Sequence, residues 1–140
     1  MNRKKWLLQC LHRAGEKGLS PVQLQKVMFL LAQNLPNTVG AEFYSFIPYN
    51  YGPFCVDIYA DAEQLQKEGL VEIRREDRRW PQYYCTPEGH IDAEAQDAPA
   101  DGVRYLSQLV EWAQARSFQE IVRSIYEYYP DFKANSVFSE

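Results

Sequence analysis

Apolar residues near the N-terminus recur with the spacing of an amphipathic helix. Over residues 3–17, Trp6, Leu7 and Cys10 share one face, whereas most of the charged residues lie elsewhere. Gly18 follows, and glycine readily adopts the left-handed conformation found at helix C-termini. The pattern predicts a first helix over 3–17 that ends at Gly18.

The next helical pattern has a clearer start signal. Ser20 suits the N-cap position, Pro21 suits the first helical position, and Gln23 completes a capping box with Ser20. Apolar residues then repeat at steps of three and four. We therefore expect a second helix over 20–35, followed by a loose segment at 38–40.

A segment rich in aromatic side chains comes next. Residues 43–47 combine aromatic and β-branched residues, which favours a short strand. Two prolines and a glycine make residues 48–54 a predicted loop. Pro53 is suited to start a third helix, which the apolar spacing predicts over 54–68, with Gly69 as its stop.

The chain then alternates in the manner of a β-hairpin. Residues 70–75 place successive side chains on opposite faces, residues 76–79 form a polar turn, and residues 80–86 return as a second strand. Pro81 limits the start of that strand to an edge or a loop. Three helices followed by a hairpin is the order of a winged helix.

The C-terminal part is predicted to be helical and acidic. Residues 90–101 are rich in Asp, Glu and Ala, and we interpret them as a mobile or weakly helical connector. Helices are expected over 102–115 and 118–129, the second opened by a capping box. For the tail at 131–140, packing through its apolar residues and fraying are both open.

These elements predict an α+β, mostly helical fold built on a winged-helix-like core. We expect a single domain over residues 1–140: the core (1–89), an acidic connector (90–101) and C-terminal helices (102–140). The 140 residues, 46% of them hydrophobic, supply enough material for such a core. No apolar run approaches the roughly 20 residues that span a bilayer. Polar residues also interrupt the stretch behind the basic N-terminus, so we expect a cytoplasmic protein without membrane contact.

Cysteine and histidine are few and widely spaced. Cys10, Cys55 and Cys85 are odd in number and fit neither a disulfide framework nor the paired spacing of a zinc site. His12 and His90 have no motif around them. Hydrolase elbows, P-loops and dinucleotide fingerprints are also absent from the sequence. We therefore expect reduced thiols, no metal or other cofactor, and a protein that is not an enzyme.

The distribution of charge disfavours reading of DNA by the third helix. The helix expected over 54–68 carries four acidic residues against one lysine, and the whole chain has a formal net charge of −4. Phosphates would repel such a helix. The hairpin instead carries four arginines: Arg74, Arg75, Arg78 and Arg79. Contact with phosphates and pairing with local acids explain these arginines equally well.

The aromatic residues of the predicted loop have two readings. We expect Phe46, Ile47 and Phe54 to join the core. For residues 49–51, a place in the core and a place on an exposed interface are both open, because tyrosine is enriched at protein interfaces.

Two motifs in this region resemble those of a known family. The first is Leu-Gln-Lys-Val-Met-Phe-Leu at residues 24–30, and the second is Tyr-Gly-Pro-Phe at residues 51–54, followed by a helix. They are similar to motifs of the Panacea (SocA-like) domain of bacterial antitoxins and phage-associated proteins. The resemblance covers about residues 20–70; the arginine hairpin and the closing helices lie outside it. It implies neutralisation of a toxin by direct protein contact, and it brings no catalytic residues.

The residues and the resemblance together predict a non-enzymatic, protein-binding regulatory module of a toxin-antitoxin or phage-related system. Its expected contact residues lie on the loop and at the start of the acidic helix: Tyr49, Tyr51, Gly52, Pro53, Asp57 and Asp61. The two aspartates would steer a basic partner, such as a basic toxin. The alternative is a winged-helix transcriptional regulator that contacts DNA through the four hairpin arginines.

Overall fold

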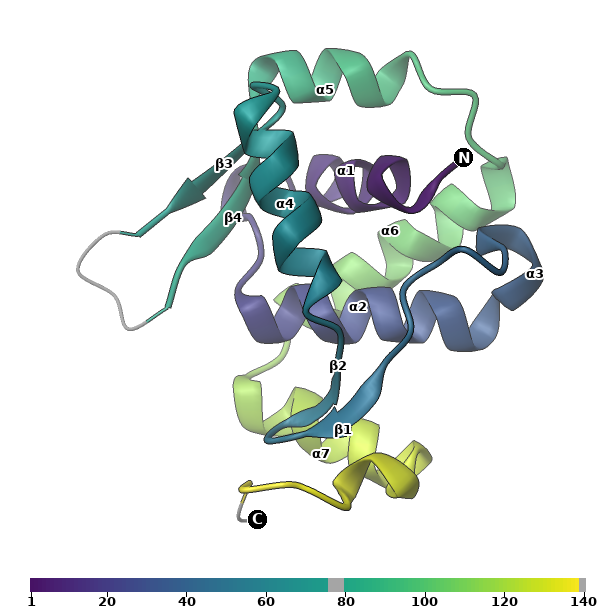
Figure 1. The fold of residues 1–140 in the computed structure, drawn as a ribbon, viewed down its shortest axis with the longest axis vertical. Helices are drawn as coiled ribbons and strands as arrows, with labels where there is room; N and C mark the ends of the chain where they lie inside the picture. The colour runs from purple at the N-terminus through teal and green to yellow at the C-terminus, as the bar shows by residue number, and fades with distance from the viewer. Residues whose placement is uncertain (76–79, 139–140) are drawn as a thin grey trace.

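A computed structural model describes residues 1–75 and 80–138 (Figure 1). The α-helices are α1 (Arg3–Ala14), α2 (Pro21–Asn34), α3 (Pro36–Val39), α4 (Asp57–Lys67), α5 (Pro87–Glu94), α6 (Ala100–Gln114) and α7 (Phe118–Tyr128). Two short 3-10 helices are η1 (Gly15–Lys17) and η2 (Pro130–Lys133). Strands β1 (Ile47–Tyr49) and β2 (Gly52–Phe54) form one antiparallel hairpin, and β3 (Val71–Arg74) and β4 (Gln82–Cys85) form another. The predicted α+β, mostly helical class is confirmed.

The order of α1, α2, α4 and the β3–β4 hairpin is that of a winged helix. Leu19, between the first two helices, bridges to Tyr83 in β4 through backbone hydrogen bonds of 3.0 and 2.9 Å. The bridge requires glycine at position 18. Gly18 has a φ of +64°, and a Cβ on it would lie 2.5 Å from the carbonyl oxygen of Tyr83. The hairpin is thereby attached to the N-terminal helices.

Helix α1 lies at the centre of the core, with α4, α5 and α6 around it (Figure 1). The side chains of Trp6, Leu7 and Leu11 on α1 are fully buried. Helix α6 packs against both α1 and α2, and its buried residues belong to the same core. Helix α7 and the tail form a second apolar cluster around Phe29 of α2, in which Phe132 and Phe138 take part. In the tail, packing therefore prevails over fraying at these two residues.

Local capping signals predicted two helix starts correctly. The side chain of Ser20 accepts a hydrogen bond from Gln23 N, and that of Ser117 accepts one from Glu120 N. In both boxes the third helical residue bonds back to the N-cap backbone. Each box satisfies two backbone donors that the first helical turn leaves free.

The prediction for residues 43–54 was wrong in its boundaries. The strand begins at Ile47, not at residue 43, and the predicted loop contains the β1–β2 hairpin. Pro48 lies opposite Pro53 in this hairpin. Because proline has no backbone N–H, the two missing hydrogen-bond donors fall at the same pair of residues and the neighbouring pairs keep theirs. Pro53 is therefore a strand residue, and the third helix starts at Asp57.

Two predicted irregular segments are helical. Residues 36–39 form α3, so the predicted loose segment at 38–40 is largely a helical turn. The first part of the expected connector at 90–101 belongs to α5, which Thr86 caps by accepting a hydrogen bond from Gly89 N. Two small buried residues hold α5 in place: Gly89 lies against Leu70 and Cys85, and the carbonyl oxygen of Ala93 accepts a hydrogen bond from Gln9 of α1. The acidic composition of the segment did not indicate these contacts.

Within residues 1–75 and 80–138, no helix has both the length and the apolar composition needed to cross a bilayer.

Candidate functional site

A groove with mainly apolar walls lies where the β1–β2 hairpin meets α2 and the start of α7. It has a volume of about 570 Å³. We call it the aromatic groove, and its lining includes Val22, Tyr49, Tyr51, Phe54, Tyr59, Trp80 and Phe118, with Gln25, Lys26 and Gln119 as polar members. Its size is in the range of sites that take a ligand or several side chains of a partner.

Two polar side chains of α2, Gln25 and Lys26, belong to the lining of the groove. Gln25 makes a pair of hydrogen bonds of 2.9 Å with the backbone N–H and C=O of Cys55. Lys26 donates from Nζ to the carbonyl oxygen of Pro53 at 2.9 Å. Buried polar groups of β2 and the residue after it are thus satisfied by α2. The Leu-Gln-Lys and Tyr-Gly-Pro motifs of the sequence are therefore in direct contact.

Lys26 is an unusual residue to bury. Its side chain is 3% exposed, and burial lowers the pKa of its ammonium group to about 7. An ammonium group has three donors. The oxygen of Pro53 is the one hydrogen-bond acceptor that the described residues offer it. Lys26 is one of the residues that line the aromatic groove.

The rim of the groove is aromatic and partly exposed. Tyr49, Tyr51 and Trp80 are 46%, 41% and 54% exposed. Tyr49 stacks on Phe54 with ring centroids 4.8 Å apart, and Tyr51 meets Phe118 edge to face at 5.1 Å. These contacts hold the two tyrosines in place while leaving part of each ring open to a partner.

Of the three residues of this region that were expected in the core, two are partly buried and one is exposed. Phe46 is partly buried against Phe29, with ring centroids 5.4 Å apart, and Phe54 is partly buried against Tyr49. Ile47, by contrast, is 58% exposed, so its prediction as a core residue was wrong. The strand that contains Ile47 pairs with β2 alone, which leaves one of its faces uncovered.

The predicted contact residues lie in two places. Tyr49, Tyr51 and Gly52 line the aromatic groove, and Pro53 is buried just behind it. Asp57 and Asp61 do not belong to its lining.

Arg3 engages both of these aspartates. Asp61 is bonded to Arg3 Nε at 2.9 Å and to the hydroxyl of Tyr44 at 2.7 Å, and Asp57 lies 3.4 Å from Arg3 Nη1. The two aspartates therefore join α4 to the start of α1.

Sequence reasoning missed the distant walls of the groove. Trp80 precedes β4, and Phe118 and Gln119 open α7, all far along the chain from the hairpin. A half-exposed tryptophan beside a proline is a weak signal for an interface, and the position of α7 had no local signal.

The described arginines of the β3–β4 hairpin are engaged with neighbours. Arg74 lies 3.2 Å from Glu72 and its guanidinium is 3.9 Å from the centre of the Tyr84 ring. Arg75 is 3.7 Å from Glu63 on α4. Arg78 and Arg79 lie outside the described residues. Pairing with local acids thus holds for both arginines whose positions are described.

The chain matches no protein-family model, and a search of curated proteins finds no similar sequence. The resemblance of its motifs to the Panacea domain stays a prediction.

Proposed function

We propose that this chain is a non-enzymatic, cytoplasmic, protein-binding regulatory module, with an antitoxin-like role as the motif resemblance implies. Its aromatic groove takes a segment of a partner protein that carries apolar side chains next to a carboxylate. One observation carries the proposal: a partly exposed aromatic rim surrounds a groove whose lining includes a buried lysine with spare donors.

The rim supplies the apolar half of this recognition. Tyrosine and tryptophan are the residues most often found at the energetic centre of protein interfaces, because they bury a large area at little cost in side-chain entropy. Tyr51 and Trp80 each keep about half of their surface for such a contact. Packing of Tyr49 and Tyr51 against neighbouring rings orders this surface before the partner binds, which reduces the entropic cost of binding.

Lys26 supplies the polar half. A buried ammonium group is poorly solvated, which is why its pKa is lowered, and a carboxylate that reaches it gains a strong, charge-assisted hydrogen bond. The expectation of a basic partner depended on Asp57 and Asp61, and both of these carboxylates already contact Arg3. At the groove itself the complementary group is acidic.

The DNA-binding alternative has one supporting observation, the winged-helix order of the elements with the Leu19–Tyr83 bridge. Two observations weigh against it. Helix α4, which occupies the position of a recognition helix, carries three acidic residues against one lysine, and the described hairpin arginines are already paired. We therefore place protein binding first.

A peptide-display selection on the purified chain tests the proposal. We expect enrichment of peptides that combine aromatic or aliphatic residues with an acidic residue or a free C-terminal carboxylate. The same selection on the double variant Tyr51→Ala/Trp80→Ala is expected to lose these peptides. Equal enrichment on both proteins would contradict the proposal, and so would binding of a random DNA duplex in preference to any peptide.

A matched control distinguishes binding in the groove from nonspecific binding to exposed aromatic residues. Tyr128 is a tyrosine on α7 that is 75% exposed and lies outside the groove lining. The variant Tyr128→Ala is expected to select the same peptides as the wild type.

A further inference from the structure

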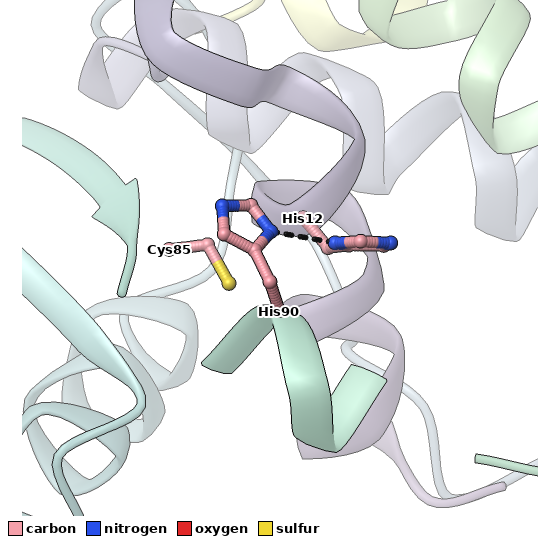
Figure 2. A group of neighbouring side chains, drawn as sticks. All are labelled: His12, Cys85 and His90. Atoms are coloured by element: carbon pink, nitrogen blue, oxygen red, sulfur yellow. Dashed lines mark hydrogen bonds between the residues drawn. The ribbon is translucent and has the colours of Figure 1, made fainter. Parts of the chain in front are cut away.

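Three potential metal ligands that are far apart in the sequence meet on the other side of α1 from the groove-forming hairpin. His12 comes from α1, Cys85 is the last residue of β4, and His90 lies in the first part of α5 (Figure 2). One ligand atom from each residue lies within 4.8 Å of the others. No residue of this trio lines the aromatic groove.

The fold holds α5 close enough to β4 for Cys85 and His90 to meet. Thr86 caps α5, and His90 N donates to Thr86 O at 2.9 Å. A Cβ at Gly89 would lie 2.1 Å from the oxygen of Leu70 and 2.7 Å from Cys85 Sγ. Only glycine therefore allows this approach of helix and strand.

A buried hydrogen bond positions α5 on α1 in the same way. Gln9, one turn before His12, donates from Nε2 to the carbonyl oxygen of Ala93 at 2.7 Å. This bond sets the position of α5 along the axis of α1, and at that position His90 lies beside His12. The two Nδ1 atoms are 2.6 Å apart and the rings are tilted by 59°. Figure 2 shows this contact as a dashed line, with the sulfur of Cys85 beside the His90 ring.

We propose that His12, Cys85 and His90 form a binding site for a borderline-soft divalent cation of the Zn²⁺ type. Two imidazoles and a thiolate are among the ligands that Zn²⁺ prefers, and three protein ligands leave a fourth position for water or another donor. A tetrahedral site places two nitrogen ligands about 3.3 Å apart. The imidazoles therefore need to separate by about 0.7 Å when the cation binds, and neither ring is fully buried.

The charges around the trio suit a cation. Asp92 acts on Cys85, and Glu94 acts on His12, where Arg13 opposes it. Burial, followed by His90 and Arg13, lowers the pKa of His12, which favours the neutral imidazole that a metal requires. Burial raises the pKa of the Cys85 thiol to about 11, with a smaller contribution from Asp92. Binding therefore replaces the thiol proton with the cation and releases that proton to solvent.

Titration of the full chain with Co²⁺, after treatment with a chelator and in the presence of a phosphine reductant, tests the site. We expect one ion per chain, with the visible bands of tetrahedral cobalt and a sulfur-to-cobalt charge-transfer band. Zn²⁺ is expected to displace the Co²⁺. The variant Cys85→Ser should lose the charge-transfer band, and His12→Gln and His90→Gln should each weaken binding at least about tenfold. The control Cys55→Ala removes a thiol outside the trio and should keep the full spectrum.

A second measurement uses the wild type alone and so does not depend on the folding of any variant. The chain contains two histidines. Long-range ¹H–¹⁵N spectra should show a ring nitrogen of each histidine shifting on addition of one equivalent of Zn²⁺, together with a rise in the thermal midpoint. Unchanged histidine nitrogens, or cobalt bands that survive in both Cys85→Ser and His12→Gln, would overturn the proposal.

Discussion

The two hairpins of this chain have short strands, of three residues in the first and four in the second, and they use their side chains in opposite ways. Three buried hydrogen bonds connect α2 to the β1–β2 hairpin and to Cys55, the residue that follows it: two join Gln25 and Cys55, and one runs from Lys26 to Pro53. The hairpin presents Tyr49 and Tyr51 at the surface. The β3–β4 hairpin is attached through the backbone bridge of Leu19, and its described arginines pair with nearby acids.

The first hairpin therefore offers a surface that is available for binding, whereas the described charges of the second hairpin are already paired. Exposed ion pairs contribute little to stability and leave little net charge for phosphates. Half-exposed aromatic rings over a firmly held backbone, in contrast, have about half of their surface still to bury. The comparison therefore favours the first hairpin as the recognition surface, although the winged-helix order alone would favour the second.

The largest effect is expected where the first hairpin is attached. The variant Gln25→Ala leaves the buried N–H and C=O of Cys55 without partners, and should lower the free energy of unfolding by about 2–4 kcal/mol. Urea denaturation measures this loss. Gln64→Ala, at an exposed position on α4, is the control and should change it by less than about 0.5 kcal/mol. If Gln25→Ala lowers the free energy of unfolding by less than about 1 kcal/mol, the side-chain bonds of the first hairpin are no stronger an attachment than expected for the second hairpin, and the comparison fails.

A pH-dependent effect follows from Lys26. Its pKa is about 7 in the folded state and about 10.4 when unfolded, so between these values the unfolded chain binds more protons. Stability that depends on Lys26 must then rise with pH. From pH 7 to pH 9, the stability of the wild type relative to Lys26→Met should increase by roughly 2 kcal/mol. Parallel denaturation curves of the two proteins measure it, and a difference that stays constant over this range would contradict the burial of the charge.

A smaller effect in free energy is expected at the rim of the groove. Tyr51→Ala should lower the affinity for a groove-selected peptide about tenfold to thirtyfold, as measured by calorimetry. The reason is that the substitution removes an aromatic ring whose exposed part is available for contact with the peptide. Tyr128→Ala should change the affinity less than about twofold. A similar loss of peptide affinity in both variants would mean that the peptide binds exposed tyrosines in general and not this groove.

The smallest effect is expected at the second hairpin. The double variant Arg74→Ala/Arg75→Ala removes two exposed ion pairs. It should leave the urea midpoint and the peptide affinity unchanged within error. A strong loss of peptide affinity, or a salt-sensitive DNA affinity that these substitutions abolish, would reverse the comparison between the hairpins.

The sequence predicted the features that depend on neighbouring residues. Both capping boxes, at Ser20 and Ser117, and the order of the winged helix follow from signals within a few positions. Helix α5 escaped prediction because its stability comes from Gly89 and Ala93 packing against distant elements. Periodicity also did not reveal that two prolines would pair across β1 and β2.

The candidate site was predictable only in its hairpin half. The aromatic residues of the loop at 49–53 indicated a contact surface, but no local pattern indicates that Gln25 bonds to Cys55 or that Lys26 bonds to Pro53. The walls formed by Trp80 and Phe118 depend on tertiary structure, as does the meeting of His12 with His90. Contacts of this kind are determined by packing across the whole chain.

The most direct measurement of the central claim is the location of a bound peptide. A groove-selected peptide is added to ¹⁵N-labelled protein, and the amide shifts are mapped onto the fold. We predict that the largest shifts fall on residues 49–52, on Trp80 and at the start of α7, and that β3 is unaffected. Shifts centred on β3 and on Arg74 and Arg75, with residues 49–52 unmoved, would contradict the account.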